Sequence, residues 1–530
     1  MARKSLTLLL SMLMMLSLVL AACSGGQSNE PAPNNTGSQG GNSQQNTNAG
    51  SNTGSNNNEQ KNEPEPPVEF TIMLPLNTAD QPTDVILKEV EKLTNAKPTY
   101  NFFPADTYEE KLSASFATGS LPEVVYMKNQ ATFIQMKEAI RDGQFWEIGP
   151  YLSEFENLSK LKESILKNTM VDGKLYSLYI GRPLARQGMI YRKDWADNLG
   201  LSAPKNIDEF YEMLRAFTYD DPDDDGLDNT IGLTDRNDLV YGAFDTVASW
   251  FGVPTNWGFK DGELRPKFMF DEYIEVMDFF RKIRDEGLMN QDFATTSKTD
   301  QVNLLTSGKA GVYVGSMQDI NSLHRDTQSN NPNAELTVQA LIEGPDGQLS
   351  TWAIPGYNNV VLFSKGAIRD ENELRKILTY FDKMMTPEVA NLMYWGIEGV
   401  HYEVVDGKAK ASSDSDLINR DVKGYKDSVI GEAETNGSLP PYIDLPARAL
   451  AEEFILKNEE IAIHDPTAAL DSATYNEKGL QLDEIWKNAT YQYIYGQIDK
   501  DGLQAAIDEW LKRGGEDVIK EFNEAYKAAQ

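Results

Sequence analysis

The chain has 530 residues, and its 81 acidic and 49 basic side chains give a formal net charge of −32 at pH 7. This balance argues against nucleic acid as a partner, because nucleic-acid-binding surfaces need a basic patch. The chain has only three histidines, widely spaced, and a single cysteine. This argues against a zinc site, a cysteine–histidine nucleophile and a disulfide framework. Acidity indicates solubility but identifies no ligand.

Residues 1–22 have the pattern of a lipoprotein signal peptide. Two basic residues precede an apolar run from 8 to 20, which is too short for a comfortable membrane span and ends in Leu-Ala-Ala-Cys. This ending resembles the lipobox of bacterial lipoproteins, which implies diacylglyceryl transfer to Cys23 and cleavage before it. An ordinary signal peptide followed by an incidental cysteine is the alternative. More than one acyl chain would make the attachment stable.

Residues 23–66 contain the lipidated Cys23 and a linker rich in Asn, Ser, Gln, Gly and Pro. Such a composition buries too little apolar surface to offset chain entropy, so we expect disorder. A flexible chain of this length reaches roughly 35 Å by random-coil scaling. We therefore expect the folded part at the outer face of a cell membrane, held only by its lipid, in a Gram-positive bacterium.

Residues 67–530 are too many for one core and predict two domains. Short β-rich segments bounded by turn residues predict strands, and apolar residues recurring every three or four positions predict helices. The strands are expected at 69–74, 121–126 and 310–315. The helices are expected at 83–93, 371–385 and 503–512. This alternation predicts an α/β protein with mostly parallel sheets and a ligand crevice beyond the carboxyl ends of the strands.

One acidic loop has the spacing of an EF-hand-type calcium site. Aspartates occupy loop positions 1, 3 and 5, and Gly226 occupies position 6, where the chain must turn sharply. Gly232 replaces the bidentate Glu of position 12, so Asp228 or Thr230 would have to close the site. A solvated acidic loop is the alternative, but clustered carboxylates repel one another without a cation, which favours structural calcium. The expected ligands are Asp221, Asp223, Asp225, Leu227, Asn229 and Thr230.

Aromatic residues beside Gly or Pro are candidate sugar-binding residues. A sugar ring has an apolar C–H face and a rim of hydroxyls, so its site needs a flat aromatic with amide, carboxylate or guanidinium partners. Core packing is the commoner role of any single aromatic, but we expect at least two of the set in a cleft. The set is Trp250, Phe251, Trp257, Trp352, Tyr357, Tyr394 and Trp395.

Seven segments form a series along the chain: Leu121–Val125, Val171–Tyr176, Ile190–Trp195, Ile207–Phe210, Ser307–Gly311, Gly396–Tyr402 and Trp510–Gly515. Taken together and in order, they resemble family 1 extracellular solute-binding proteins. The similarity is greatest to oligosaccharide-binding lipoproteins of Gram-positive ABC importers, and more distant to maltose- and alginate-oligosaccharide-binding proteins. The alginate binders carry a comparable calcium loop.

The resemblance implies a two-lobed periplasmic-binding-protein type II fold with a hinge and a ligand between the lobes. We expect residues 67–185 and 353–415 in lobe 1, and residues 186–352 and 416–530 in lobe 2. By the same resemblance, the cleft residues are Lys128, Asn129, Arg182, Ser316 and Gln318. Gln318 stands near the position of the stacking Trp of maltose-type relatives, so other aromatics would have to stack on the sugar. Those expected in the cleft are Trp250, Trp352, Tyr357 and Trp395.

The resemblance also implies a monomeric substrate-binding lipoprotein that is not an enzyme, captures an oligosaccharide and delivers it to the permease of an ABC importer. The sequence contains no P-loop, GxSxG elbow or GxGxxG fingerprint. A surface-anchored glycan-degrading enzyme stays open as an alternative, because the separation of two carboxylates cannot be read from sequence. A solute sensor for a membrane receptor is the third possibility. The sequence does not identify the sugar.

Overall fold

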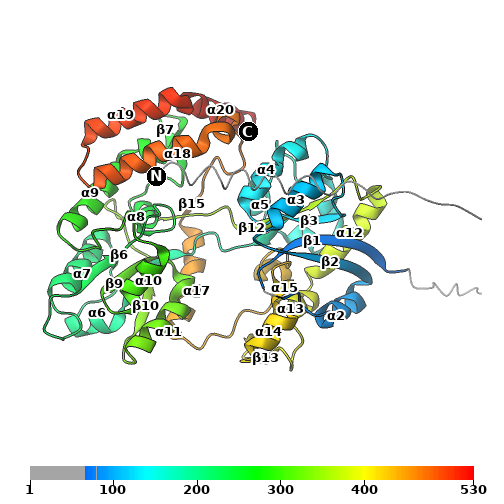
Figure 1. Cartoon of the computed structure of the whole chain (residues 1–530), viewed down its shortest axis with the longest axis horizontal. Helices are drawn as coiled ribbons and strands as arrows, with labels where there is room; N and C mark the ends of the chain where they lie inside the picture. Colours follow the sequence, from blue (N-terminus) through cyan, green and yellow to red (C-terminus); the bar gives the residue numbers. More distant parts are fainter. Residues whose placement is uncertain (1–65, 79, 530) are drawn as a thin grey trace, which may run out of the picture. The chain divides into compact units, whose positions relative to one another are not determined.

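Two β-sheets, each built from distant parts of the chain, divide the protein into two α/β lobes (Figure 1). The computed structural model describes residues 66–78 and 80–529. The expected signal peptide, Cys23 and nearly all of the expected linker lie outside the described residues. None of the described helices is long and apolar enough to cross a lipid bilayer.

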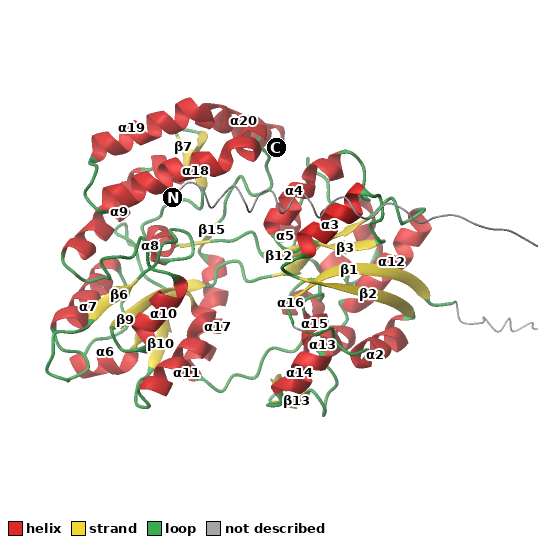
Figure 2. Ribbon diagram, in the orientation of Figure 1, coloured by secondary structure: helices red, strands yellow, loops and turns green. Residues whose placement is uncertain are grey.

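The first lobe contains a five-stranded sheet in the order β2-β1-β3-β12-β4. Its strands are β1 (Val68–Leu76), β2 (Ala96–Pro104), β3 (Val124–Tyr126), β4 (Ser177–Gly181) and β12 (Tyr357–Phe363). Most of β1 and all of β3 are buried, because helices cover both faces of this sheet (Figure 2). Its helices are α2 (Val85–Thr94), α3 (Tyr108–Ala117), α4 (Gln130–Arg141), α5 (Glu163–Asn168), α12 (Glu371–Met384), α13 (Pro387–Trp395), α14 (Ser415–Asp421), α15 (Lys423–Lys426) and α16 (Ala433–Asn436).

The second lobe contains a four-stranded sheet in the order β10-β5-β9-β6. Its strands are β5 (Gln187–Arg192), β6 (Ile231–Thr234), β9 (Ala310–Ser316) and β10 (Leu336–Gln339). Its helices are α6 (Lys193–Leu199), α7 (Ile207–Tyr219), α8 (Ala243–Trp250), α9 (Asp271–Asp285), α10 (Lys298–Thr306), α11 (Ile320–Asn330), α17 (Pro446–Glu460), α18 (Ala473–Ile494), α19 (Lys500–Trp510) and α20 (Glu516–Ala528). Side chains alternate across β9, so Val312 and Val314 join one core and Tyr313 joins the other.

Short elements complete the two lobes. Three of them are two-stranded sheets, in which β7 (Trp257–Lys260) pairs with β8 (Glu263–Pro266), β11 (Thr351–Trp352) with β15 (Ala462–Ile463), and β13 (Tyr402–Val405) with β14 (Lys408–Ala411). Short 3₁₀ helices occupy Gly149–Glu154, Leu158–Lys160, Lys267–Met269 and Met317–Asp319. A π-helical turn at Leu511–Gly515 joins α19 to α20.

The expectation of mostly parallel sheets is wrong, because each sheet contains a reversed strand. β12 runs antiparallel to β3 and β4, and β5 runs antiparallel to β9 and β10. The pairs β1–β2, β1–β3 and β6–β9 are parallel, as expected. Both reversed strands arrive directly from the other lobe, so they start at the edge of the sheet where the neighbouring strands end.

Three segments carry the chain between the lobes: 181–187, 352–357 and 436–446. The third crossing, at 436–446, comes later in the chain than residue 415, where the boundary between the lobes was expected. Side chains that follow α14, among them Val422, Tyr425 and Ile430, lie in the core of the first lobe. Ala447, Ala451 and Ile455 of α17 lie in the second lobe.

Candidate functional site

A pocket of about 490 Å³ lies between the two lobes, beside the crossing segment 181–187. The first lobe contributes Lys162, the end of α13 and the residues around α16. The second lobe contributes Gln318 and one side of α17, and the crossing itself contributes Arg182. Because residues of both lobes and of the crossing line it, a molecule bound here would contact every part that moves if the lobes rotate.

The end of α13 places two aromatic rings at this pocket. Tyr394 and Trp395 are half-buried, and their rings meet edge to face with centroids 4.9 Å apart. The Trp395 Nε1–H donates to the Leu439 carbonyl oxygen at 2.9 Å. Lys426 Nζ lies 4.0 Å from the Tyr394 ring centroid and 5.3 Å from that of Trp395. The indole is therefore held in one orientation, as a surface for the apolar face of a sugar requires.

Charged side chains from both lobes meet inside the pocket. Lys162 Nζ lies 3.3 Å from Glu432 Oε1 in the first lobe and 3.9 Å from Glu459 Oε2 in the second. Burial acts to lower the pKa of Lys162, but the nearby carboxylates outweigh it and raise that pKa. Burial also raises the pKa of Glu432, against the opposing effect of Lys162. Lys162 therefore stays charged and links the two lobes electrostatically.

The carboxyl end of β9 carries a second polar group, which belongs to the second lobe. Asp319 Oδ2 accepts hydrogen bonds from Lys298 Nζ at 3.0 Å and from the Tyr313 hydroxyl at 2.8 Å. Asp319 also acts electrostatically on Arg186, which precedes β5. This group follows Gln318, a residue of the second lobe that lines the pocket beside the crossing.

An exposed aromatic ring follows β6. Tyr241 is 46% exposed, and its ring centroid lies 5.8 Å from that of Trp352. Trp352 is buried and donates its Nε1–H to Thr246 Oγ1 at 3.1 Å. Arg236 donates to Asp238 Oδ2 at 3.1 Å and to the Tyr241 carbonyl oxygen, which fixes the loop. Tyr241 thus presents a supported aromatic face at the carboxyl end of β6, where α/β sheets bind ligands.

A smaller polar pocket of about 70 Å³ lies at the carboxyl ends of β1 and β3. Asn77, Lys128, Asn358, Asn359 and Asp427 line it. Asn77 Nδ2 donates to Asp427 Oδ2 at 3.1 Å, and Asn359 Oδ1 is buried with no hydrogen-bond partner among the described residues. A buried acceptor of this kind is available to a donor such as a sugar hydroxyl.

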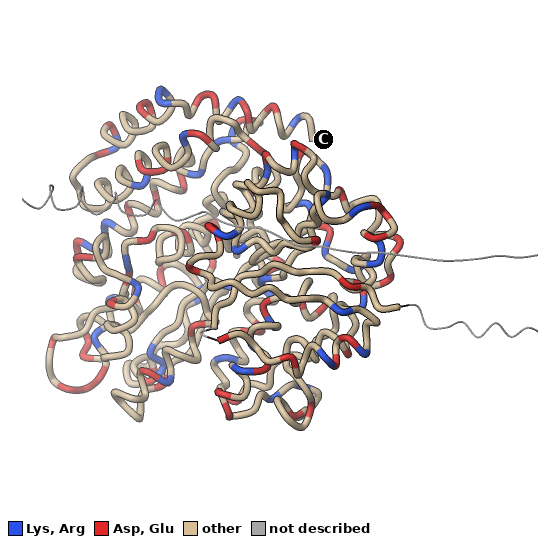
Figure 3. The backbone as a smooth tube through the Cα atoms, turned by 45° about the vertical axis from the view of Figure 1, so that its right-hand side comes forward, with Lys and Arg blue, Asp and Glu red and all other residues tan. Residues whose placement is uncertain are grey.

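The acidic loop lies between α7 and β6, and it is the continuous red stretch at the left edge of Figure 3. Carboxylate oxygens of Asp221, Asp223 and Asp225 lie within 4.8 Å of one another. Asp221 accepts hydrogen bonds from the backbone N–H groups of Asp225 and Gly226, which wraps the chain around it. Gly226 has a φ of 77°, a conformation that suits the sharp turn expected at loop position 6.

The donor set of this loop fits a hard cation. Asp223 Oδ1 is buried and has no hydrogen-bond partner in the described part of the chain, so one carboxylate oxygen of the triad is free to accept. Burial, followed by the proximity of Asp225 and Asp221, raises the pKa of Asp223. A divalent cation would remove this repulsion, and three carboxylates are the oxygen donors that calcium prefers.

The other expected calcium ligands are differently placed. Asn229 Nδ2 donates to Asp225 Oδ2 at 3.0 Å, which leaves the Asn229 amide oxygen as a donor for a cation. The Leu227 side chain is exposed, so only its carbonyl could act. The Thr230 hydroxyl is buried and donates to the Phe217 carbonyl oxygen at 2.8 Å. Thr230 therefore supports the loop from α7.

Comparison with known proteins decides the family. The profile of the family described as bacterial extracellular solute-binding protein matches residues 77–389. The chain belongs to this family. This solute-binding protein is also 40% identical over 470 residues to the polygalacturonan/rhamnogalacturonan-binding protein YtcQ of Bacillus subtilis, covering 88% of this chain and 93% of YtcQ. Lipoprotein LipO of the same organism is 34% identical, covering 87% of this chain and 92% of LipO.

Solved structures show the same fold. A solute-binding protein of Bifidobacterium longum infantis, described as binding HMO, has a TM-score of 0.70 at 17% identity, covering 87% of this chain and 99% of its own. The alginate-binding protein AlgQ2 has a TM-score of 0.61 at 16% identity, with 87% and 98% covered. An EF-hand mutant of the Streptococcus pneumoniae protein FusA has a TM-score of 0.60 at 17% identity, with 87% and 99% covered. The expected two-lobed α/β fold is confirmed.

Four of the expected cleft residues of this solute-binding protein lie at its pockets. Arg182, Gln318 and Trp395 line the pocket between the lobes, and Lys128 lines the smaller one. Their contact with a ligand stays a prediction. Asn129 is less available, because its side chain accepts from the Thr132 N–H at 2.9 Å and caps α4. Ser316 Oγ is buried at the end of β9 and has no hydrogen-bond partner within residues 66–78 and 80–529.

The expectation for Trp250 is wrong. Trp250 is 1% exposed and lies in the core of the second lobe, with its ring 5.4 Å from that of Phe210. The apolar run of α8 places it on the inner face of that helix. Tyr357 is also buried, against Phe133, and Trp352 is covered by Tyr241. Neither ring offers an open face.

Sequence reasoning missed Tyr241 and Arg186. Neither residue belongs to a recognisable motif, and only the fold brings the two side chains close enough to interact electrostatically. The single available signal for Tyr241 was its position beside Gly242, the same criterion that selected the other aromatics.

Proposed function

We propose that this solute-binding protein captures an acidic oligosaccharide of the galacturonan type between its lobes and delivers it intact to the permease of an ABC importer. The pocket between the lobes carries the proposal, because it joins the aromatic face of Trp395 to charged groups of both lobes. The named ligand of YtcQ, at 40% identity, supports the sugar class.

The proposed mechanism is closure without chemistry. The ligand enters the open pocket, and the segments 181–187, 352–357 and 436–446 absorb the rotation of one lobe. Contacts from both lobes exist together only after rotation, so the ligand favours closure through its differential affinity. The permease would then recognise the matched outer surfaces of the two closed lobes.

Calcium and the lipid anchor complete the proposal. Asp221, Asp223 and Asp225 would hold a structural calcium ion, with Asn229 and the Leu227 carbonyl as further oxygen ligands. The description of FusA as an EF-hand mutant supports a cation loop in a protein of the same fold. Cys23 would carry the lipid that holds the monomeric protein at the outer face of a Gram-positive membrane, and the name of LipO supports a lipoprotein.

Isothermal titration with oligogalacturonides and with neutral malto-oligosaccharides tests this function. We expect binding of the oligogalacturonides and recovery of the sugars uncut, as shown by anion-exchange chromatography of the mixture. Shortened products would instead establish the glycan-degrading enzyme. Tighter binding of the neutral sugars would refute the acidic ligand.

A further inference from the structure

Two arginines lie on the crossing segment that borders the pocket: Arg182 lines the pocket, and Arg186 stands four residues further along the chain. The Arg182 backbone N–H donates to the Gly356 carbonyl oxygen at 3.0 Å, which ties this crossing to the second crossing. The Arg186 carbonyl oxygen accepts from the Met317 N–H at 3.0 Å, which ties it to the loop after β9. The backbone at both arginines is therefore fixed, and both side chains are half-buried.

These guanidinium groups differ from those of the other described arginines. Within residues 66–78 and 80–529, each of the other arginines donates to a carboxylate or a backbone carbonyl. Arg182 and Arg186 make no side-chain hydrogen bond and no ion pair in the same residues, and Arg186 Nε is buried without a partner. A guanidinium has five N–H donors, and leaving a buried donor unsatisfied is unfavourable.

The two positive groups also repel each other. Burial lowers the pKa of Arg186, and the charge of Arg182 lowers it further. Asp319 acts in the opposite direction, but its Oδ2 already accepts from Lys298 and Tyr313. The crossing therefore holds two close cations without a dedicated counter-ion, in a protein whose net charge is −32.

We propose that Arg182 and Arg186 bind a carboxylate of the ligand, and so select uronic-acid residues over neutral sugars. This inference rests on the proposed function. A planar guanidinium fork matches the two oxygens of a carboxylate, and such charge-assisted hydrogen bonds are the strong ones. The carboxylate would accept hydrogen bonds from several of the free N–H donors, and its charge would offset the repulsion at the crossing. The Trp395 ring in the same pocket would meet the apolar face of a sugar of the same chain.

The test combines a change in the protein with a change in the ligand. Trigalacturonate and its methyl ester differ only at their carboxyl groups, which methylation makes neutral and slightly larger. We expect wild-type protein to bind the acid at least about tenfold more tightly than the ester, as loss of charged hydrogen bonds predicts. We expect the double variant R182Q/R186Q to lose this preference, with acid and ester bound within about twofold of each other.

A matched control removes the same net charge elsewhere. Arg325 and Arg369 are exposed and already paired with Asp326 and Glu373, so R325Q/R369Q should keep the preference for the acid. Thermal unfolding checks the fold of each variant, and Arg182→Gln alone, at the pocket wall, replaces the double variant if that variant is unstable. R182K/R186K should recover part of the preference, since it keeps the charges without the planar fork.

Three results would overturn the inference in distinguishable ways. A double variant that still prefers the acid refutes the role of the arginines and leaves the proposed function intact. Wild-type protein that binds acid and ester equally refutes carboxylate selection but not oligosaccharide capture. Wild-type protein that binds neither refutes the proposed function together with the inference.

Discussion

Asp235, at the end of β6, is a buried carboxyl group that the ligand pocket does not use. It is 2% exposed, and its Oδ1 accepts a hydrogen bond from the Ala243 N–H at 2.8 Å, which fixes the start of α8. Burial raises the pKa of Asp235 to about 7, although backbone hydrogen bonds oppose this. The folded protein therefore holds a proton here at pH values where the unfolded chain has released it.

Replacing Asp235 by Asn should remove one pH dependence of stability. A carboxyl whose pKa is raised from 3.8 to about 7 by folding stabilises the folded state below pH 4, and this contribution is lost as pH rises through 7. The unfolding free energy of wild type, measured relative to that of D235N, should fall by up to about 4 kcal/mol between pH 4 and pH 8. Urea unfolding at several pH values measures it. Parallel profiles for the two proteins would contradict this assignment.

The pair Lys267–Asp245 should be essential to the second lobe. Lys267 Nζ donates to both carboxylate oxygens of Asp245, at 2.7 and 2.6 Å, and both side chains are buried. Lys267→Met would leave a buried carboxylate without its cation, so we expect a loss of about 3–5 kcal/mol in unfolding free energy. Adding Asp245→Asn should recover much of it. A double variant as unstable as the single one would show that lost packing, not charge, is responsible.

At the residue scale, the sequence predicted the placement of side chains correctly where one function required a given residue type at a given spacing. The carboxylates at loop positions 1, 3 and 5 do come together, because the spacing itself places them on one turn. Single aromatics could not be assigned in this way. Trp250 and Trp395 both follow apolar helical residues, and only the packing of α8 into a core and of α13 at a cleft separates them.

At the element scale, the loop between α7 and β6 gives a prediction for calcium. If Asp221, Asp223 and Asp225 hold the ion, calcium binds only the folded loop and raises the unfolding temperature by a few degrees, and EDTA reverses this. Asp223→Asn should abolish the calcium response. Asp224→Asn should keep it, because Asp224 is equally acidic but is not part of the triad. The same response in D223N and D224N would place the ion elsewhere.

Elements with strong local signals were predicted well. The strands expected at 69–74 and 310–315 correspond to β1 and β9, and the helix expected at 371–385 corresponds to α12. The helix expected at 503–512 begins at Lys500 instead, because Asp499 caps it by accepting from the Gly502 N–H. Strand direction was not predictable, since it depends on where the chain crosses between lobes and not on local pattern.

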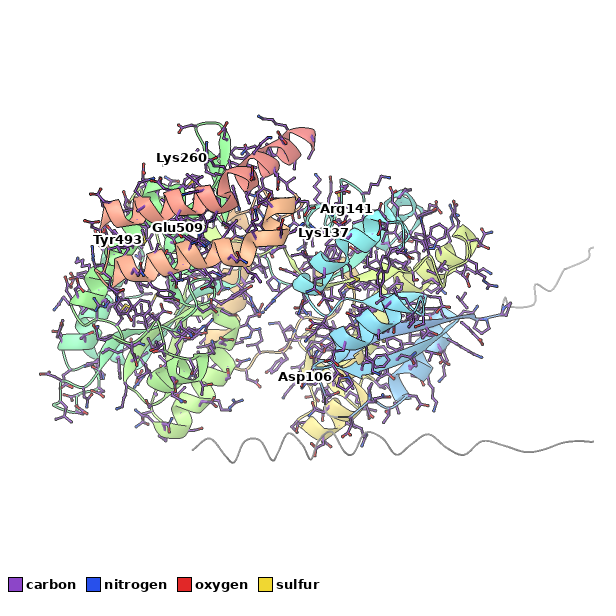
Figure 4. The ribbon with its side chains drawn as sticks, turned by 45° about the horizontal axis from the view of Figure 1, so that its top comes forward. Asp106, Lys137, Arg141, Lys260, Tyr493 and Glu509 are labelled. Atoms are coloured by element: carbon purple, nitrogen blue, oxygen red, sulfur yellow. The ribbon has the colours of Figure 1, made fainter. Side chains whose placement is uncertain are left out.

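At the scale of the whole molecule, an ion pair links the lobes away from the pocket. Arg141 of α4 donates to Asp471 Oδ2, just before α18, at 2.6 Å, and also to Asp172 in its own lobe. Figure 4 shows Lys137 and Arg141 on the side of α4 that faces α18. Figure 2 shows α4 and α18 on one side of the crossing segments 181–187 and 352–357, and α16 and α17, which line the pocket, on the other side of these two segments.

Breaking this ion pair should therefore tighten ligand binding. A rotation that closes the pocket on one side of the crossings widens the gap on the other, so the Arg141–Asp471 pair opposes closure. Asp471→Asn removes a contact of about 0.5–1 kcal/mol, which predicts two- to fivefold tighter binding of the oligosaccharide. Asp172→Asn removes a partner of Arg141 within one lobe and should leave affinity unchanged. Isothermal titration measures both variants, and weaker binding by D471N would mean that the ion pair forms in the closed state instead.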